Sequence, residues 1–336
     1  MPTNPASGPA VSVIIPARNE EINLGACLES ITAQTGISFE VIVVDDHSAD
    51  RTAEIAHSYP TVRVMAAPDL TPGWTGKNNA VIAGTAAARG EWLLFTDADT
   101  VHLPGSLAAS VAEAQQHEAA LLSYSPRQIV KSLAERALMP LIFADLAATF
   151  RPSEVSNPDS PAAAANGQFI LVRKEAYDAV GGHRAVAGEI LEDVALARAF
   201  KRKGYKIFFR YGGDLIETRM YRSYAQLREG WTKNLALLFP EPQKLAAIRV
   251  AEFVMCVAGV VLSILGIKAH HPIIVFFGLL PVLISFVRLR LAHFPVITTI
   301  ISFLGLPVFA YLLIRSQNMH KKHQITWKGR EYSSQA

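Results

Sequence analysis

The sequence predicts an α/β fold with a mostly parallel sheet, followed by C-terminal helices that cross a membrane. Before about residue 245, short apolar runs of strand length alternate with helical patterns, which is typical of parallel, doubly wound sheets. After that point apolar residues dominate as far as Ile314, interrupted only by short polar clusters. The mean hydropathy of +0.23 is high for a purely soluble enzyme. These observations place a globular domain first and a membrane region second.

Strands and helices follow each other in the first half of the chain. We expect strands at 11–15, 41–44, 62–65 and 91–95, and helices at 20–34, 76–88 and 190–203. Pro16 ends the first strand, because proline lacks the N–H that a central strand donates. The helical period of residues 20–34 predicts one buried face, which is formed by Ile22, Leu24, Cys27, Leu28 and Ile31.

Composition limits the class of protein. With 336 residues, of which 50% are hydrophobic, the chain is long enough for one large core and a second module. A net charge of +3 gives no reason to expect nucleic acid as a partner. Cys27 and Cys256 fit neither a disulfide framework nor a metal-site spacing, which indicates a reducing compartment. Residues 1–10 contain no basic or apolar signal region, so we expect a short disordered leader there and no signal peptide.

Asp97 and Asp99 follow the apolar strand 91–95. Along an extended strand, residues two apart lie on the same side, and open α/β sheets bind ligands at the carboxyl ends of their strands. Two carboxylates at such an edge suit Mg²⁺ or Mn²⁺ shared with the phosphates of a nucleotide. The alternative is a pair that only caps a turn, which is the commoner role of an isolated Asp-x-Asp.

The second strand ends in Asp45 and Asp46, a position where a carboxylate commonly accepts a hydrogen bond from a ligand. No G-x-G-x-x-G follows the first strand, and no G-x-x-x-x-G-K-[ST] occurs in the chain. The sequence therefore disfavours a nicotinamide or flavin fold and a P-loop. Ser48 and Asp50 come next, and we expect them to cap the following helix.

Four motifs in one order resemble family 2 glycosyltransferases, which have a GT-A fold. They are VIIPARNEE at 13–21, VVDDHS at 43–48, Asp97-Ala98-Asp99, and Glu192-Asp193. The segments GWTGKN at 73–78, NGQF at 166–169 and WKGR at 327–330 narrow the resemblance to membrane-bound enzymes that glycosylate hydrophobic lipids. Carotenoid (hydroxychlorobactene-type) glucosyltransferases and hopanoid-associated glycosyltransferases are the most similar groups. The resemblance implies a Rossmann-like GT-A domain.

The resemblance also implies a nucleotide-sugar site with a divalent metal, Mg²⁺ or Mn²⁺. Asp99 would bind the metal directly, and Asp97 would contact the ribose or the water around the metal. Lys77 lies where a helix begins, and a cation together with backbone N–H groups favours a diphosphate there. An ordinary exposed lysine is the alternative. The residues implied to bind the nucleotide sugar are Pro16, Ala17, Glu20, Asp45, Asp46, Lys77, Asp97 and Asp99.

Glu192 and Asp193 open the predicted helix 190–203. Carboxylates in a first turn often only complement the helix dipole. By resemblance, however, Asp193 is the general base that deprotonates an acceptor hydroxyl. One base without a covalent nucleophile implies single displacement, with inversion at the anomeric carbon of the sugar.

The acceptor side is expected to include Glu192, Gln168 and Trp231. Trp231 provides either an aromatic platform or a buried core side chain. Processive members of the family carry Gln-x-x-Arg-Trp, whereas this chain has glycine at position 230, before the tryptophan. We therefore expect transfer of one sugar rather than polysaccharide synthesis, with Arg228 or Lys233 as replacements for the missing arginine.

Three apolar stretches at 253–267, 273–287 and 294–314 make up the membrane region, and only the last clearly reaches the ~20 residues that span a bilayer. A further apolar stripe at 129–150 packs either on the sheet or in the membrane interface. We expect a glycosyltransferase domain at 11–245, two to three apolar helices at 246–315 and a basic tail at 316–336. Basic residues in that tail favour the cytosol, so we expect one stretch, 273–287, not to cross.

The sequence leads to two competing functions. The first is an inverting, metal-dependent transferase that moves one sugar, glucose from UDP-glucose, to a hydroxyl of a carotenoid or hopanoid lipid. Its domain would lie in the cytosol at the inner membrane, because nucleotide sugars are made in the cytosol, and its partners would be the donor, the lipid acceptor and the phospholipid bilayer. Polyprenyl phosphate, glycerolipid or ceramide are alternative acceptors. The second function is a noncatalytic membrane scaffold, which would not need carboxylates at positions 97, 99 and 193 together.

Overall fold

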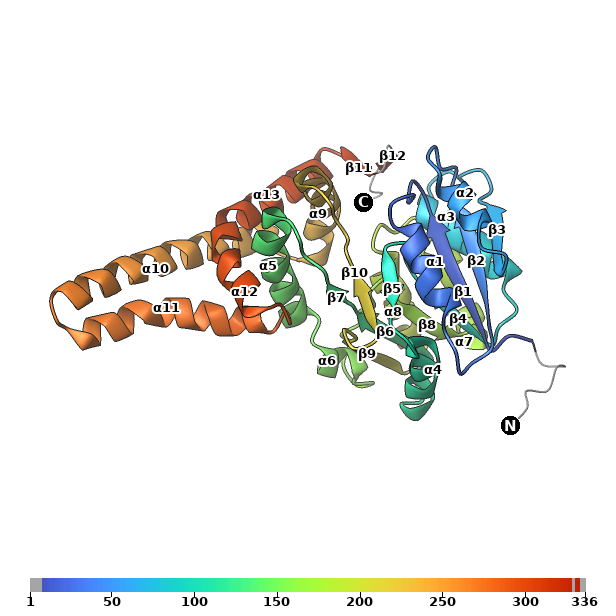
Figure 1. Cartoon of the computed structure of the whole chain (residues 1–336), viewed down its shortest axis with the longest axis horizontal. Coiled ribbons are helices and arrows are strands. Elements are labelled where there is room, and N and C mark those ends of the chain that lie inside the picture. Colours follow the sequence, from blue (N-terminus) through green and yellow to red (C-terminus); the bar gives the residue numbers. More distant parts are fainter. Residues whose placement is uncertain (1–7, 328–329, 333–336) are drawn as a thin grey trace. The chain divides into compact units, whose positions relative to one another are not determined.

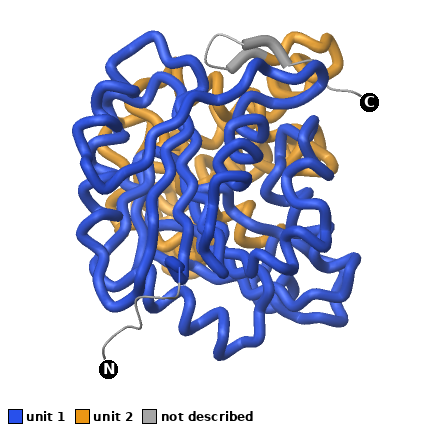
Figure 2. The backbone as a smooth tube through the Cα atoms, turned by 90° about the vertical axis from the view of Figure 1, so that its right-hand side faces the viewer, with its two compact units in different colours: residues 1–129, 150–219 blue, residues 130–149, 220–336 orange. Residues whose placement is uncertain are grey.

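The chain forms two compact units in the computed structural model, which describes residues 8–327 and 330–332. The first, here called the sheet unit, consists of residues 1–129 and 150–219, and the second, the helical unit, of residues 130–149 and 220–336 (Figure 2). The expected leader 1–10 lies mostly outside the described residues. The expected boundary near residue 245 differs from this division, because the helices at 133–149 and 224–238 pack with the C-terminal helices.

The sheet unit contains a seven-stranded sheet in the order β3-β2-β1-β4-β8-β6-β9 (Figure 1). Its strands are β1 (Val11–Ala17), β2 (Phe39–Asp45), β3 (Val62–Ala66), β4 (Trp92–Phe95), β6 (Leu121–Ser125), β8 (Ile170–Arg173) and β9 (Ile207–Tyr211). Only β8 runs antiparallel to its neighbours, β4 and β6. The mostly parallel sheet that the sequence predicted is therefore confirmed. The first strand is longer than expected, since β1 continues through Pro16 to pair with β2 as far as Asp45.

Helices cover both faces of this sheet. They are α1 (Leu24–Thr32), α2 (Thr52–His57), α3 (Gly76–Ala87), α4 (Ser106–Gln116), α6 (Pro152–Ser156), α7 (Lys174–Ala179) and α8 (Glu192–Arg202), with a 3₁₀ helix η1 at Gly182–Val186. Buried side chains of α3 and α8 share one core with alternate strand residues, and those of α1 and α4 share the other. A small second sheet contains β5 (Thr100–His102), β7 (Arg127–Gln128) and β10 (Ile216–Thr218).

Helix starts follow local chemistry. Thr75 caps α3 by accepting a hydrogen bond from the backbone N–H of Asn78 at 3.2 Å. α1 begins at Leu24 instead of Glu20, and Ile22, expected inward, is 63% exposed in the turn before it. The expected caps of α2 are not the observed ones, because the N-cap position belongs to Arg51. Asp50 still accepts from the N–H of Thr52 at 3.0 Å, whereas Ser48 accepts from the N–H of Asn19.

The helical unit contains α5 (Leu133–Thr149), α9 (Tyr224–Leu238), α10 (Pro242–Lys268), α11 (Pro272–Arg290), α12 (Val296–Ser302) and α13 (Leu306–Lys321). A 3₁₀ turn, η2 (Phe303–Gly305), joins the last two helices, and strands β11 (Ile325–Trp327) and β12 (Arg330–Tyr332) follow. The apolar stripe of α5 packs against α13 in the core of this unit. Phe150, at the end of the predicted stripe, instead packs against a core of the sheet unit, which was one of the two expected locations.

Three segments are long and apolar enough to cross a membrane: α10, α11 and the stretch Val296–Lys321. Their most apolar windows have mean hydropathies of 2.4, 2.3 and 2.2. The expectation that only the last reaches a spanning length is wrong, since α10 has 27 residues and α11 has 19 despite Pro281.

α10 and α11 form a hairpin whose backbones approach closely. A Cβ on Gly259 would collide with the carbonyl of Gly278, and one on Gly278 would collide with the Ser263 hydroxyl. Small residues at such contacts are typical of helices packed in a membrane. Only 22% of the apolar window of α10 and 17% of that of α11 are buried, so most apolar side chains of the hairpin face outward.

Four charged side chains, the charge quartet, join this hairpin to α5. Arg288 on α11 lies 2.7 Å from Asp145 on α5 and 3.0 Å from Glu252 on α10. Arg249 on α10 pairs with Glu252 and lies 3.4 Å from Asp145. Two cations face two carboxylates, so the quartet is neutral, which is the arrangement that makes charges tolerable inside an apolar helix bundle.

The third apolar segment is different, because half of its window is buried inside the helical unit. The helix breaks at η2, where a Cβ on Gly305 would collide with the carbonyl of Ala137 on α5. α13 then packs on the polar helix α9. Ser316 donates to the carbonyl of Thr232 at 2.6 Å, and His320 lies 2.8 Å from the carbonyl of Lys233.

Candidate active site

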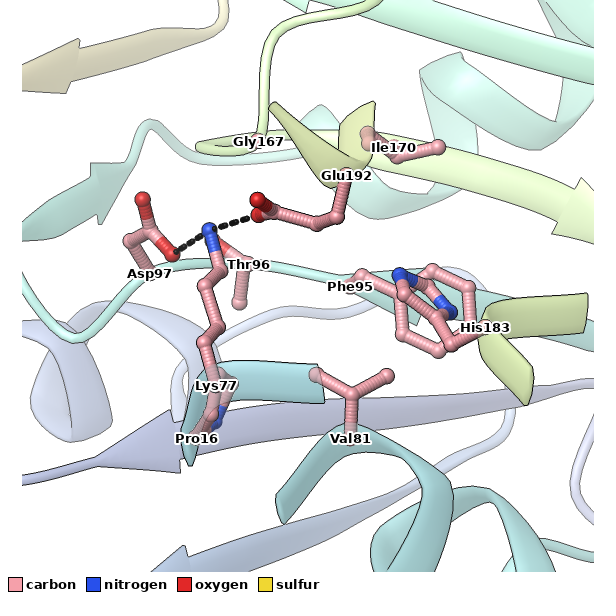
Figure 3. Close-up of a pocket in the computed structure, with 10 residues that line it drawn as sticks. All are labelled: Pro16, Lys77, Val81, Phe95, Thr96, Asp97, Gly167, Ile170, His183 and Glu192. Atoms are coloured by element: carbon pink, nitrogen blue, oxygen red, sulfur yellow. Dashed lines mark ion pairs between the residues drawn. The ribbon is translucent and has the colours of Figure 1, made fainter. Parts of the chain in front are cut away.

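Lys77 lies at the centre of the site. Its Nζ is 2.7 Å from Asp97 Oδ1 and 2.8 Å from Glu192 Oε1 (Figure 3). The lysine comes from the first turn of α3, Asp97 follows β4, and Glu192 begins α8. Burial alone would lower the pKa of Lys77, but the two carboxylates outweigh it and raise that pKa above its ordinary value. Lys77 is therefore a charged, paired group and not an ordinary exposed lysine.

The acidic pair does not lie on an extended strand. β4 ends at Phe95, and residues 97–100 form a turn in which the N–H of Thr100 donates to the carbonyl of Asp97 at 3.1 Å. The alternation argument for Asp97 and Asp99 is wrong in this respect. Both side chains are still half-buried. Burial, and then the charges of Asp99, Glu20 and Asp97, raises the pKa of the Cys27 thiol.

Asp97 and Asp99 offer only oxygen atoms as ligands, and such ligands fit a divalent ion of the Mg²⁺ or Mn²⁺ type. Within the described part of the chain, no group of three or more His, Cys, Asp and Glu side chains could enclose a metal. Asp97 and Asp99 alone would supply only part of the ligands of such an ion. They do not fit a metal held by the protein alone.

Asp193 lies near Lys77 and Glu192, around the backbone of Gly167. Its Oδ2 accepts a hydrogen bond from the N–H of Gly167 at 3.0 Å, and its Oδ1 accepts from the N–H of Val194 at 2.8 Å. Burial and the adjacent charge of Glu192 raise the pKa of Asp193 to about 6, although Lys77 and the two N–H groups oppose them. Both oxygens of this carboxylate therefore accept a backbone N–H.

Gly167 brings these groups together. A Cβ at this position would lie 2.8 Å from Lys77 Nζ, 3.4 Å from Glu192 Oε1 and 3.5 Å from Asp193 Oδ2. One backbone position thus touches a cation and two carboxylates that are distant in the sequence. Only a residue without a side chain leaves Lys77 where it lies.

Sequence reasoning missed the apolar wall of the pocket. Val81, Phe95, Ile170 and His183 line it together with Pro16 and Lys77. His183 is buried, its Nδ1 lies 2.8 Å from the Tyr177 hydroxyl, and its ring packs edge-on against Phe95. Burial lowers the pKa of His183 to about 4, so the ring is neutral at pH 7. No sequence motif marks His183 as a pocket residue, and only its contacts in the folded chain identify it as one.

The residues expected to hold the nucleotide lie on neighbouring strand ends. Ala17 and Asp45 pair across β1 and β2, and the N–H of Asp46 donates to the carbonyl of Ala17 at 2.8 Å. The N–H of Glu20 donates to the hydroxyl of Thr52 at 2.7 Å, which fixes the loop after β1. The structure therefore brings Ala17, Glu20, Asp45 and Asp46 to one edge, next to Pro16 of the pocket.

Two residues expected on the acceptor side, Gln168 and Trp231, have buried side chains. The side chain of Gln168 points into the interior, where its Nε2 donates to the Thr218 hydroxyl at 3.1 Å. Trp231 is only 2% exposed and packs between Tyr221 and Phe143 in the helical unit, which is the core role. A Cβ at Gly230 would collide with the Tyr221 ring. Packing thus explains why glycine precedes this tryptophan.

A mostly parallel sheet that gathers a lysine and several carboxylates at its carboxyl edge is the arrangement of a GT-A enzyme. The chain belongs to glycosyl transferase family 2, whose sequence profile matches residues 12–181, and it is a glycosyltransferase. It is 30% identical over 343 residues to the 4,4'-diaponeurosporenoate glycosyltransferase of Staphylococcus aureus (strain MRSA252), a match that covers 96% of this chain and 88% of the relative. The same enzyme of strain USA300 is 29% identical with the same coverage.

The solved structure of mannosyltransferase PcManGT from Pyrobaculum calidifontis in complex with GDP-Man and Mn²⁺ is similar in fold. Its TM-score is 0.54 at 17% identity, over 94% of this chain and 88% of that one. At this identity the similarity concerns the fold alone.

Gly167→Ala tests the arrangement around Lys77. The new methyl group would displace the flexible end of the lysine and leave the backbone in place, so we expect normal folding. We expect the sugar-transfer rate to fall roughly tenfold or more, the cost of one charge-assisted hydrogen bond. Thermal unfolding and initial rates measure both quantities. Gly25→Ala, where the nearest atom to the new methyl is 3.9 Å away, is the matched control. An unchanged rate in Gly167→Ala would contradict the assignment.

Proposed function

We propose that the protein transfers one glucose from UDP-glucose to a hydroxyl of a carotenoid-type lipid at the cytoplasmic face of the inner membrane. The observation that carries this proposal is the pairing of Lys77 with Asp97 and Glu192, next to the half-buried carboxylate of Asp193. It combines a charged group for a diphosphate with a base for an acceptor. The S. aureus relatives, which match along 96% of the chain, support the carotenoid acceptor.

The donor end contains the groups that a diphosphate needs. Lys77 is fully charged and lies at the N-terminus of α3, where backbone N–H groups also attract phosphate. Phosphate oxygens can replace one carboxylate on the lysine without leaving its charge unpaired. Asp99 and Asp97 would hold the metal, which when bound offsets the negative charge of the departing diphosphate.

The acceptor end contains one base. Asp193 is deprotonated at pH 7, and its pKa of about 6 makes it a stronger base than an ordinary aspartate. It takes the proton of the acceptor hydroxyl while that oxygen forms a bond to the anomeric carbon. The bond from that carbon to the diphosphate breaks, and the nucleoside diphosphate leaves with its electrons. A single displacement of this kind inverts the anomeric configuration.

A carboxylate acceptor is the second candidate, because the name of the S. aureus relatives specifies diaponeurosporenoate. A carboxylate is already ionised and needs little help from a base. The two candidates therefore differ in their dependence on Asp193.

We propose that α10 and α11 are the two membrane crossings and that the third apolar segment stays on the cytosolic side. At 1.5 Å per residue, α10 and α11 are roughly 40 and 28 Å long, against a hydrocarbon core of about 30 Å. The third segment is broken, half buried and packed on the polar helix α9. This assignment replaces the expectation that 273–287 fails to cross, since α11 is continuous and mostly exposed.

Metal dependence is the first test of this function. EDTA should abolish transfer, and Mg²⁺ or Mn²⁺ should restore it. Asp99→Ala should fold normally but lose at least ~10²-fold in rate, as expected for a preorganised charge-stabilising group. Binding of Mn²⁺ in the presence of UDP, followed by electron paramagnetic resonance, should weaken in the same variant. The exposed Asp69→Ala is the control. Near-normal turnover in Asp99→Ala would remove the metal role.

Asp193→Asn tests whether Asp193 acts as the base or contributes to donor binding. We expect donor affinity to persist while the catalytic constant falls by roughly 10²-fold or more. Because only the deprotonated carboxylate accepts a proton, the wild-type rate should fall as pH drops through about 6. Rate–pH profiles and donor titrations measure this, with the exposed Asp178→Asn as control. Equal losses of donor affinity and rate would place Asp193 in the donor pocket, and full activity would favour the carboxylate acceptor.

Cysteine labelling tests the two-crossing topology. The native Cys27 and Cys256 are buried. Ala269→Cys at the tip of the hairpin should react with a membrane-impermeant maleimide in intact cells. Ser334→Cys, in the part of the tail outside the described residues, should react only after permeabilisation, because five basic residues (Arg315, Lys321, Lys322, Lys328 and Arg330) hold the tail in the cytosol. Labelling of Ser334→Cys in intact cells would mean three crossings.

A further inference from the structure

Lys201, on the last turns of α8, holds a loop through backbone carbonyls. Its Nζ lies 2.9 Å from the carbonyl oxygen of Asn157, 2.8 Å from that of Ser160 and 2.5 Å from that of Ala162. The carbonyl of Glu154 is farther away, at 3.4 Å. An ammonium group has three N–H donors, so the three nearest carbonyls match its capacity.

The loop is poor in donors of its own. Pro158 and Pro161 have no N–H, and each follows one of the carbonyls that Lys201 binds. Backbone carbonyls that leave water need a donor. The N–H of Ser160 donates to the carbonyl of Asn157 at 3.2 Å, and those of Asp159 and Ala162 donate to side chains of the loop. Lys201, on a neighbouring helix, therefore adds donors for three carbonyls of a loop that has few of its own.

The clamped loop leads directly to the active site. After it, Ala163, Ala164 and Ala165 are buried in the sheet-unit core, and the N–H of Asn166 donates to the Ser123 hydroxyl at 2.8 Å. The next N–H, that of Gly167, is the one that binds Asp193.

α8 thus grips this segment at two places. Asp193 binds Gly167 near the start of the helix, and Lys201 binds the loop eight residues later, roughly 12 Å along the axis. The glycine that touches Lys77, Glu192 and Asp193 is held between these two attachments and the hydroxyl of Ser123.

We propose that Lys201 is a positioning residue for sugar transfer, because its hold on residues 157–162 keeps Gly167 against Asp193 and Lys77. The inference rests on the proposed function in one respect, namely that Asp193 is the base. The clamp itself is a property of the fold and can be tested without any substrate.

A graded series of variants tests the clamp. Lys201→Met keeps the length of the side chain and removes all three donors, and Lys201→Gln keeps an amide with two donors. Arg198→Met is the matched control, because Arg198 is an exposed cation on the same helix. The full-length protein in detergent is used throughout. Lys201→Gln also serves if Lys201→Met fails to fold.

Hydrogen exchange is the first readout. We expect the amides of residues 159–167 to exchange roughly tenfold faster or more in Lys201→Met, less so in Lys201→Gln, and normally in Arg198→Met. Amides of β1 and β4 should keep their wild-type protection in all variants. Unchanged protection of 159–167 in Lys201→Met would overturn the clamp, whatever the enzyme does.

Steady-state kinetics is the second readout. We expect kcat to fall roughly 10- to 100-fold in Lys201→Met, as for a small misplacement of reacting groups, with the KM for UDP-glucose within about threefold of wild type. A purely local structural role would change the protection of amides against exchange but would leave kcat unchanged. Faster exchange with a normal kcat would therefore overturn the positioning role. Failure of the proposed base appears elsewhere, as full activity of Asp193→Asn.

Discussion

The ion pairs of Lys77 are the interaction on which the site depends. A cation on α3 holds a carboxylate that follows β4 and another that begins α8, so three chain segments meet at one charge. None of them would be stable there alone, since a half-buried ammonium or carboxylate without a partner is costly. The parallel sheet provides the meeting point, because the strands beneath end at the same edge. The ion pairs thereby keep in place the cation that we propose to bind the diphosphate.

The two adjacent carboxylates of α8 differ through their surroundings. Glu192 faces Lys77 at 2.8 Å, whereas Asp193 receives only N–H groups and feels the charge of its neighbour. Residues with the same chemistry are thus divided into the ion-pair partner of Lys77 and the carboxylate that we propose as the base. Enzymes commonly assign acid and base roles in this way, by setting apart the pKa values of two nearby groups.

The sequence predicted the parts of the molecule that depend on local pattern. β1 to β4, the capped start of α3 and the acidic first turn of α8 all lie within about four residues of their expected positions. The strands β6, β8 and β9 were not predicted, because their neighbours in the sheet are distant in the chain. Motif residues Lys77, Asp97 and Asp193 do meet, but His183 has no sequence signal and reaches the pocket only through packing. Trp231 and Gln168 are the opposite case, since a sequence motif marked them but they do not line the pocket. Both belong to expected motifs, and tertiary contacts bury their side chains elsewhere.

The charge quartet has a consequence for biosynthesis. Isolated Arg249, Glu252 or Arg288 would each oppose entry of its helix into lipid. Neutrality requires Asp145, which lies on α5 and leaves the ribosome before the hairpin does. In the proposed topology the hairpin therefore reaches the membrane with its counter-charge already made, in a helix that lies in the sequence between the two parts of the sheet unit. Its insertion would then depend on Asp145, and an arbitrary apolar anchor would leave that carboxylate without its two arginine partners.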